Sequence, residues 1–295
     1  PFETVDYGKS NTKEIKMVPD ENYAIVQIKI NGIAQNFTVS DDGSYTIPAG
    51  FFTEMKENKH IVVKYMSKHT KLVINKVDKF DSNKKLKSAK FKIEQIEEKY
   101  KVENQISDSV ITQGEYGFDK TGESKYVSNN KGKDNTVATS YIPIDLTGFG
   151  GEYTLTVNAM ISSESYYDCG YAIISDNTTV PNYSQNKGRF IYIYGNVNQK
   201  NYTTVLTGGK MYYLHLIYKK NNSTSSGNDI FTINSISLKF NNPEIQTNDL
   251  GQAFAELSFG KYKITELEAP EGYIKSEEPI EYEMVEDKEN EITIQ

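Results

Sequence analysis

The segment from Phe259 to Tyr273, FGKYKITELEAPEGY, places an acidic side chain on the apolar face of a predicted strand. Tyr262, Ile264 and Glu266 alternate with lysine and threonine residues, and residues two apart in a strand share a face. Glu266 is therefore predicted to point into the core. A buried carboxylate is costly unless it is paired or protonated. The fold must therefore either pair Glu266 or keep its carboxyl group protonated.

A second predicted strand makes the same unusual choice with a basic residue. In the segment KLVINKVD, Leu72, Ile74 and Lys76 share one face. Burial among apolar groups favours the uncharged form of an amine, which is also its nucleophilic form. A buried lysine and a buried glutamate on two strands therefore have two explanations, a structural ion pair or a chemically reactive Lys–Glu pair.

Short alternating runs separated by turn residues predict an all-β protein built from several β-sandwiches. The 22 Tyr and 13 Phe fit this class, since aromatic residues favour half-exposed sheets. Asn31-Gly32 between two apolar runs predicts a tight hairpin, and residues 269–272 predict a turn after which Tyr273 opens the next extended run. The predicted strands are residues 12–18, 23–30, 35–40, 44–48, 60–66, 71–78, 89–95, 141–146, 152–161, 170–175, 189–195, 202–207, 211–220 and 229–240.

Three segments resemble the Cna B-type domain, the prealbumin-like repeat of Gram-positive surface adhesins and pilins. They are LVINKVD, which contains Lys76, LKSAKFKI at residues 86–93, and GKYKITELEAPEGY at residues 260–273. The resemblance implies that Lys76 attacks an Asn or Asp side chain of the last strand to form an isopeptide bond, with Glu266 as proton shuttle. It places the acceptor just past Gln295. Asn290 is the second candidate, because it shares a face with Ile292 and Ile294.

These matches divide the chain into domains. Residues 1–70 are predicted to form an N-terminal β-sandwich spacer, and residues 71–104 and 243–295 the two parts of one B-type domain. Residues 105–242 would be an inserted domain, which a surface loop accommodates at little entropic cost. The insert resembles the jelly rolls of carbohydrate-binding modules in the order of GEYTLTVNA, GGKMYYLHLIYKK and FTINSISLKF.

Aromatic and polar side chains in the insert are candidates for binding a glycan. Sugar sites combine exposed aromatic faces with amide, carboxylate or guanidinium groups, and arginine makes stacking and bidentate contacts that lysine cannot make. The alternative is that the tyrosines only cover half of a sheet, as is common in β-proteins. The candidate residues are Tyr166, Tyr167, Asp168, Arg189, Tyr192 and Tyr194.

Composition and motifs argue against several other classes of function. Lys and Arg total 33 against 40 Asp and Glu, and the net charge of -7 disfavours nucleic acid as a partner. The sequence has no apolar run long enough to insert into a membrane, and its one cysteine, Cys169, cannot form an internal disulfide. Cys169 is predicted to be a small buried residue, since the three histidines give it no local support as a nucleophile.

The sequence also contains none of the common catalytic, metal-binding or phosphate-binding motifs. We therefore expect no enzyme activity, cofactor or metal. Asp41 and Asp42 are better explained by a hairpin turn than by calcium.

The leading hypothesis is a fragment of a cell-wall-anchored adhesin or pilin-like protein, extracellular and monomeric, with a host glycan or matrix protein as partner. The start at Pro1 without a Met fits an internal fragment. One alternative is the carbohydrate-binding region of a secreted carbohydrate-active enzyme, and another is a structural spacer without a ligand. The anchoring motif of the full gene, or a hydrolase domain in it, would separate the first two.

Overall fold

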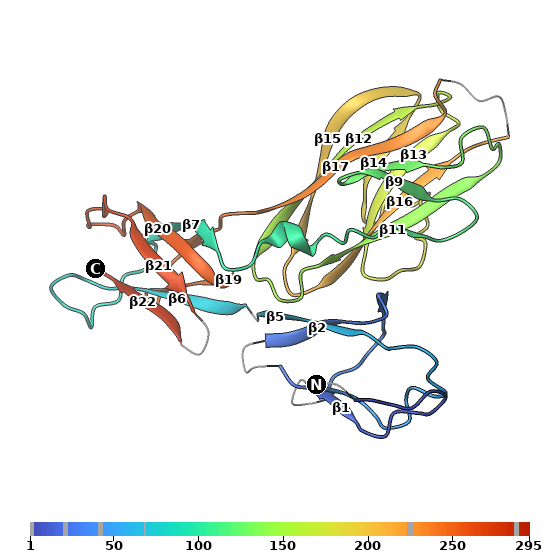
Figure 1. Ribbon diagram of the computed structural model, residues 1–295. Helices are drawn as coiled ribbons and strands as arrows, with labels where there is room; N and C mark the ends of the chain where they lie inside the picture. Colours follow the sequence, from blue (N-terminus) through green and yellow to red (C-terminus); the bar gives the residue numbers. More distant parts are fainter. Residues whose placement is uncertain (1–2, 20–22, 41–43, 68, 223–226, 286–288) are drawn as a thin grey trace.

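The computed structural model describes residues 3–19, 23–40, 44–67, 69–222, 227–285 and 289–295. These residues form β-sheets joined by loops, with one short 3₁₀ helix, η1 (Val102–Gln105). The prediction of an all-β chain with several sandwiches is confirmed. Figure 1 shows three groups of strands, with the chain entering through the N-terminal group and the C-terminus in the group that contains β6 and β22.

The N-terminal group contains two small sheets. β1 (Ile15–Met17) pairs with β4 (Tyr45–Ile47), and β2 (Tyr23–Ile30) pairs with β3 (Ile33–Ala34) and β5 (Ile61–Ser67). Asn31 and Gly32 both have positive φ, 50° and 81°, so the predicted hairpin is confirmed.

One prediction for the N-terminal group is wrong. Residues 35–40 form no strand. Phe37 packs against the core of this group, whereas Val39 is exposed, so the segment uses its apolar residues without pairing as a strand. The proposed calcium ligands Asp41 and Asp42 lie outside the described residues.

The second group, which we call the stalk domain, consists of a four-stranded and a three-stranded sheet. Its core strands alternate as predicted, because every second residue of β20 is buried. β22 pairs with β6 in parallel, whereas the other strand pairs of this domain are antiparallel. The strand order in the four-stranded sheet is β18 (Glu244–Gln246), β7 (Lys90–Glu98), β20 (Gly260–Glu268) and β21 (Ile280–Met284). The strand order in the three-stranded sheet is β19 (Gln252–Leu257), β6 (Thr70–Lys76) and β22 (Asn290–Ile294).

The predicted turn after β20 is present. The amide of Tyr273 donates to the Pro270 carbonyl at 3.0 Å, and Gly272 has a φ of 83°. Tyr273 does not open a strand, since β21 begins only at Ile280. Its hydroxyl instead donates to Asp78 Oδ2 at 2.7 Å, which connects the turn to the segment that follows β6.

The third group lies between β7 and β18 in the chain and is a sandwich of two five-stranded antiparallel sheets, which we call the insert. All seven strands predicted for this region are present. Each has buried residues that face the opposite sheet. The strand order in the first sheet is β15 (Asn196–Thr207), β12 (Glu152–Ser162), β17 (Ile230–Phe240), β10 (Lys125–Ser128) and β9 (Phe118–Gly122). The strand order in the second sheet is β14 (Arg189–Tyr194), β13 (Cys169–Ser175), β16 (Met211–Lys219), β11 (Val137–Asp145) and β8 (Ile111–Thr112).

The insert and the stalk domain share one continuous apolar core. At their junction the Phe240 ring packs edge-on against Tyr153 and against Tyr262 of the stalk domain. Ser258 Oγ accepts from the Gly150 amide at 3.0 Å and lies 3.1 Å from the Tyr153 hydroxyl. Buried packing combined with satisfied polar groups fixes the position of the insert on the stalk domain.

Candidate functional site

Lys76 and Glu266 meet in the core of the stalk domain. Lys76 is the last residue of β6, Glu266 lies on β20 of the opposite sheet, and their side chains are 4% and 2% exposed. Lys76 Nζ lies 3.0 Å from Glu266 Oε1 and 3.2 Å from Oε2, and only the contact with Oε2 has the geometry of a hydrogen bond. The partner that the sequence required for Glu266 is therefore Lys76.

Two backbone contacts complete the surroundings of this pair. Glu266 Oε2 accepts from the Ser276 amide at 2.9 Å, and Lys76 Nζ donates to the Gln295 carbonyl at 3.2 Å. The second contact follows from the register, in which Ile294 lies opposite Lys76. The amine thus reaches the chain where it leaves β22, beside the position that follows Gln295.

Asn290, the second candidate for the acceptor, is too far from Lys76. It pairs with Leu72, four residues before Lys76 on β6, which corresponds to about 13 Å along a strand. Its amide group is also engaged, because Oδ1 accepts from the Val285 amide and Nδ2 donates to the Val285 carbonyl, each at 3.0 Å. Asn290 therefore caps the start of β22 and does not face the amine.

The tyrosines proposed as ligand contacts gather on the outer face of the insert. The rings of Tyr192 and Tyr194 on β14 lie 5.7 Å apart, and the Tyr166 ring lies 4.9 Å from Tyr194. Tyr166 is 74% exposed and Tyr192 47%, whereas Ile191 and Ile193 are buried on the opposite face of β14. Tyr167 is also exposed. We call Tyr166, Tyr167, Tyr192 and Tyr194 the tyrosine surface.

Arg189 joins this surface to the loop at residues 176–188. Its guanidinium carbon lies 4.9 Å from the centre of the Tyr192 ring, a stacking contact. Nη1 donates to the Tyr183 carbonyl at 3.0 Å, and Nη2 donates to Asn186 Oδ1. Arg189 therefore positions the loop, in addition to lying beside the exposed tyrosines.

Asp168 is not part of the tyrosine surface, contrary to the prediction. It is 1% exposed, and its Oδ1 accepts from the Asn221 amide at 2.9 Å. Burial is the main cause that raises the pKa of Asp168, with the nearby Asp229 carboxylate adding to the effect. The side chain points into the sandwich because its hydrogen bond fixes the start of the loop that follows β16.

The same end of the insert contains a buried ion pair that the sequence did not reveal. Lys220 contacts Asp229 Oδ2, lies 3.5 Å from Asp134 Oδ1, and has a side chain that is 1% exposed. Asp229 also accepts from the Tyr218 hydroxyl at 3.1 Å and from the Gly132 amide at 2.7 Å. These contacts hold the ends of β16 and β17 together across the two sheets.

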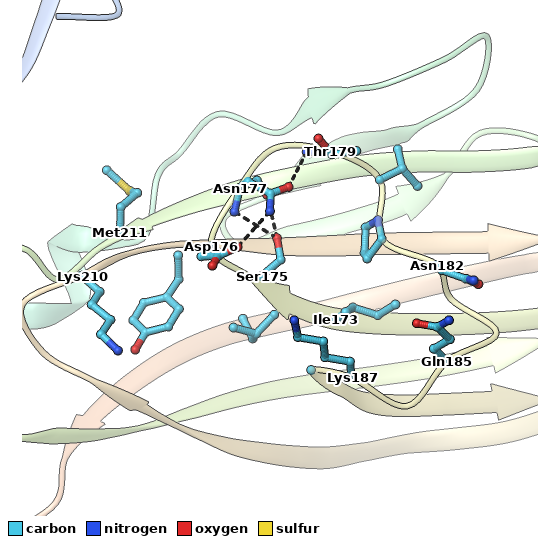
Figure 2. Close-up of a pocket in the computed structure, with 15 residues that line it drawn as sticks. Ile173, Ser175, Asp176, Asn177, Thr179, Asn182, Gln185, Lys187, Lys210 and Met211 are labelled. Atoms are coloured by element: carbon cyan, nitrogen blue, oxygen red, sulfur yellow. Dashed lines mark hydrogen bonds between the residues drawn. The ribbon is translucent and has the colours of Figure 1, made fainter. Parts of the chain in front are cut away.

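A cavity of about 800 Å³ lies between the loop at residues 176–188 and the start of β16. Ile173, Ile174 and Tyr212 contribute apolar surface, and the polar lining includes Ser175, Asn177, Asn182, Gln185, Lys187 and Lys210. Figure 2 shows these side chains around Ser175, with hydrogen bonds of the Ser175–Thr179 segment drawn as dashed lines. No sequence pattern pointed to this cavity, because most of its lining comes from loop residues without periodicity.

His215 supports one wall of this cavity from the outer face of β16, opposite to the face on which Leu214 and Leu216 enter the core. Its Nε2 lies 3.0 Å from Ser175 Oγ and 3.1 Å from the Asn177 carbonyl oxygen, and burial lowers the pKa of the imidazole. The Ser175 hydroxyl donates to the Asn177 carbonyl at 2.6 Å. The serine proton is thus directed at a carbonyl, so we assign this group a structural role.

The described residues contain no group of three or more His, Cys, Asp or Glu side chains arranged to hold a metal ion. Among the same residues, no helix has the length and apolar character needed to cross a membrane. Cys169 is a free, buried cysteine whose Sγ lies 3.9 Å from the Tyr192 hydroxyl.

Comparison with known proteins supports the interpretation of the stalk domain. Residues 215–295 match the family model of the SpaA prealbumin-like fold domain. The matched segment includes β18–β22 and begins within β16 of the insert, whereas β6 and β7 precede the insert. The match therefore covers the part of the stalk domain that follows the insert, together with β17 and the end of β16. No curated protein matches the chain significantly.

Two solved pilins align with the chain at low similarity. The major pilin subunit BcpA of Bacillus cereus is 12% identical, with 77% of this chain and 99% of the pilin covered and a TM-score of 0.19. The T6 backbone pilin of Streptococcus pyogenes serotype M6 is 11% identical, with 74% and 80% covered and a TM-score of 0.15. We draw the prealbumin-like assignment from the family match alone.

Proposed function

We propose that this chain is part of a cell-wall-anchored, pilin-like surface adhesin in which the stalk domain presents the insert to a host glycan or matrix protein. The observation that carries the proposal is the tyrosine surface, which is exposed on a sandwich fixed to the stalk domain through a shared core. Exposed aromatic side chains of this kind mark binding surfaces. The prealbumin-like match supports an extracellular, cell-surface location and a non-enzymatic role.

The binding role is tested with the whole chain on immobilised glycans and matrix proteins. We expect binding that is lost when Tyr166→Ala and Tyr192→Ala are combined, because Tyr192 is the most exposed tyrosine of β14 and Tyr166 the most exposed tyrosine of the loop beside it. Tyr7→Ala is the control, since Tyr7 is about as exposed as Tyr166 but belongs to the N-terminal group. Absence of binding to all immobilised ligands, or equal loss in the control, would contradict an adhesive role.

We also propose that Lys76 forms a self-made isopeptide cross-link to an Asn side chain, with Glu266 as the proton shuttle. In a chain that continues past Gln295 with an Asn, the Lys76 amine would attack the side-chain carbonyl carbon, and ammonia would leave. Glu266 would carry the proton between amine and leaving group, which its position at Nζ permits. Such a chain is expected to weigh about 17 Da less than its sequence mass, as the loss of ammonia requires. An unchanged mass would leave a structural ion pair as the role of the two residues.

A further inference from the structure

We propose that the cavity between residues 176–188 and the start of β16 binds an acidic saccharide, through the Lys187 and Lys210 ammonium groups and the amide side chains around them. This inference rests on the adhesive function proposed above and names a ligand class for it. The cavity volume of about 800 Å³ lies within the range of small-ligand sites.

The charge of the lining favours an anionic ligand. The lining contains two basic residues, Lys187 and Lys210, and one acidic residue, Asp176, so the cavity has a local charge of +1 in a chain with a net charge of -7. Within the described part of the chain, neither lysine makes an ion pair. The Asp176 carboxylate already accepts from Asn177 Nδ2 at 2.8 Å. Two ammonium groups are therefore free to meet a carboxylate or sulfate.

The remaining polar groups suit the hydroxyls of a sugar. Asn182 and Gln185 contribute amide donors and acceptors, and Tyr212 and Ile174 provide an apolar surface for a sugar ring. Both lysines lie below Ser175 in the view of Figure 2, at the same cavity as these amides. A ligand with one acidic group and several hydroxyls would use both kinds of contact.

The wall of the cavity is held in place before any ligand arrives. The Thr179 amide donates to Asn177 Oδ1 at 3.0 Å, and the Ser184 amide donates to Asn182 Oδ1 at 3.1 Å. Gly188 has a φ of 69°, and a Cβ there would lie 2.1 Å from the Ile174 carbonyl oxygen, so the loop closes against β13. A fixed loop reduces the entropy lost on binding.

The cavity also adjoins the tyrosine surface through Arg189, which holds Tyr183 and Asn186 of the same loop while stacking on Tyr192. A saccharide of several units could therefore place its acidic residue in the cavity and a neutral residue against the tyrosines.

The test is isothermal titration of the whole chain with two disaccharides at low salt. One contains glucuronic acid and N-acetylglucosamine, and in the other glucose replaces glucuronic acid. We expect the acidic probe to bind at least about tenfold more tightly, equivalent to about 1.4 kcal/mol. Combining Lys187→Gln with Lys210→Gln should remove this preference, and Asp176→Asn should increase it. Competition by sodium sulfate would show that the anionic group alone suffices for recognition.

The matched control combines Lys200→Gln with Lys239→Gln, which removes the same charge from β15 and β17 of the other sheet. Equal affinity for the two probes, no binding of the acidic probe, or a preference that survives Lys187→Gln with Lys210→Gln overturns the inference. The adhesive function is judged separately, by the tyrosine substitutions. Glycan binding that depends on Tyr166 and Tyr192 but is equally tight for the acidic and the neutral probe would still support the adhesive function.

Discussion

Removing Lys76 should destabilise the stalk domain strongly, because Glu266 would lose its charged partner inside the core. Both side chains are at most 4% exposed, and after Lys76→Met the carboxylate would keep only the Ser276 amide. Breaking one side of a buried ion pair costs roughly 3–5 kcal/mol. The stalk domain and the insert share one core and together have about 225 residues, so each kcal/mol shifts the melting temperature by about 2–4 °C and a loss of at least about 6 °C is expected.

The assay is thermal unfolding followed by circular dichroism, after an intact mass has established whether Lys76 is cross-linked. Replacing both residues, Lys76→Met with Glu266→Leu, should recover most of the loss, since an apolar pair leaves no buried charge. Lys87→Met is the matched control, because Lys87 pairs with Asp249 at 3.1 Å on the exposed surface and should scarcely change the melting temperature. A Lys76→Met protein that melts like the wild type would refute the reasoning.

Three further measurements test the insert and its junction. Burial raises the pKa of Asp168, so the stability that its protonated form contributes is present at low pH and is lost as pH rises through the folded-state pKa. Asp168→Asn should therefore raise the melting temperature at pH 7, with a smaller gain near pH 4. Burial lowers the pKa of His215, so stability should fall as pH drops below the unfolded-state value of about 6.5, and His215→Gln should flatten this dependence in thermal melts between pH 7.5 and 5.5. Ser258→Ala removes the acceptor of the buried Gly150 amide, and urea denaturation should show a loss of roughly 1–3 kcal/mol, whereas an unchanged midpoint would show that the junction contributes little.

The alternation of buried and exposed residues allowed the core residues of the stalk domain to be predicted from its sequence. Every second residue of β20 is buried, so Glu266 could be assigned to the core before any partner was known. Lys76 could be assigned in the same way from β6. The same pattern located the seven longer strands of the insert, because each carries several apolar residues toward the opposite sheet.

The short strands of the insert lacked such a pattern. β9 and β10 each place one large aromatic residue in the core, Phe118 and Tyr126, among polar residues. One buried apolar residue per strand gives no hydrophobic period, so these strands depend on pairing with each other and with β17. Tertiary contacts, which local sequence does not encode, override propensity here.

Side-chain direction in loops was likewise beyond the sequence. Tyr166, Tyr167 and Asp168 are consecutive, and the two tyrosines are exposed while Asp168 is buried. The difference arises from the hydrogen bond to Asn221, a residue far along the chain. The Lys220–Asp229 pair and the cavity lining depend on contacts of the same kind, since neither follows a strand period.

The parallel pairing of β6 with β22 gives the stalk domain a mechanical property that suits the proposed role. The chain enters at the start of β6 and leaves at the end of β22, so tension applied between these points pulls the two strands past each other. β6 and β22 lie side by side (Figure 1), so their ladder hydrogen bonds must then break together and the load passes directly between the two strands. The insert is connected between β7 and β18, outside this path. A ligand-binding sandwich attached there would keep its cavity and tyrosine surface undistorted while the stalk domain carries tension. A cross-link from Lys76 to the chain beyond Gln295 would reinforce the pairing of β6 with β22 at the C-terminal end of β22.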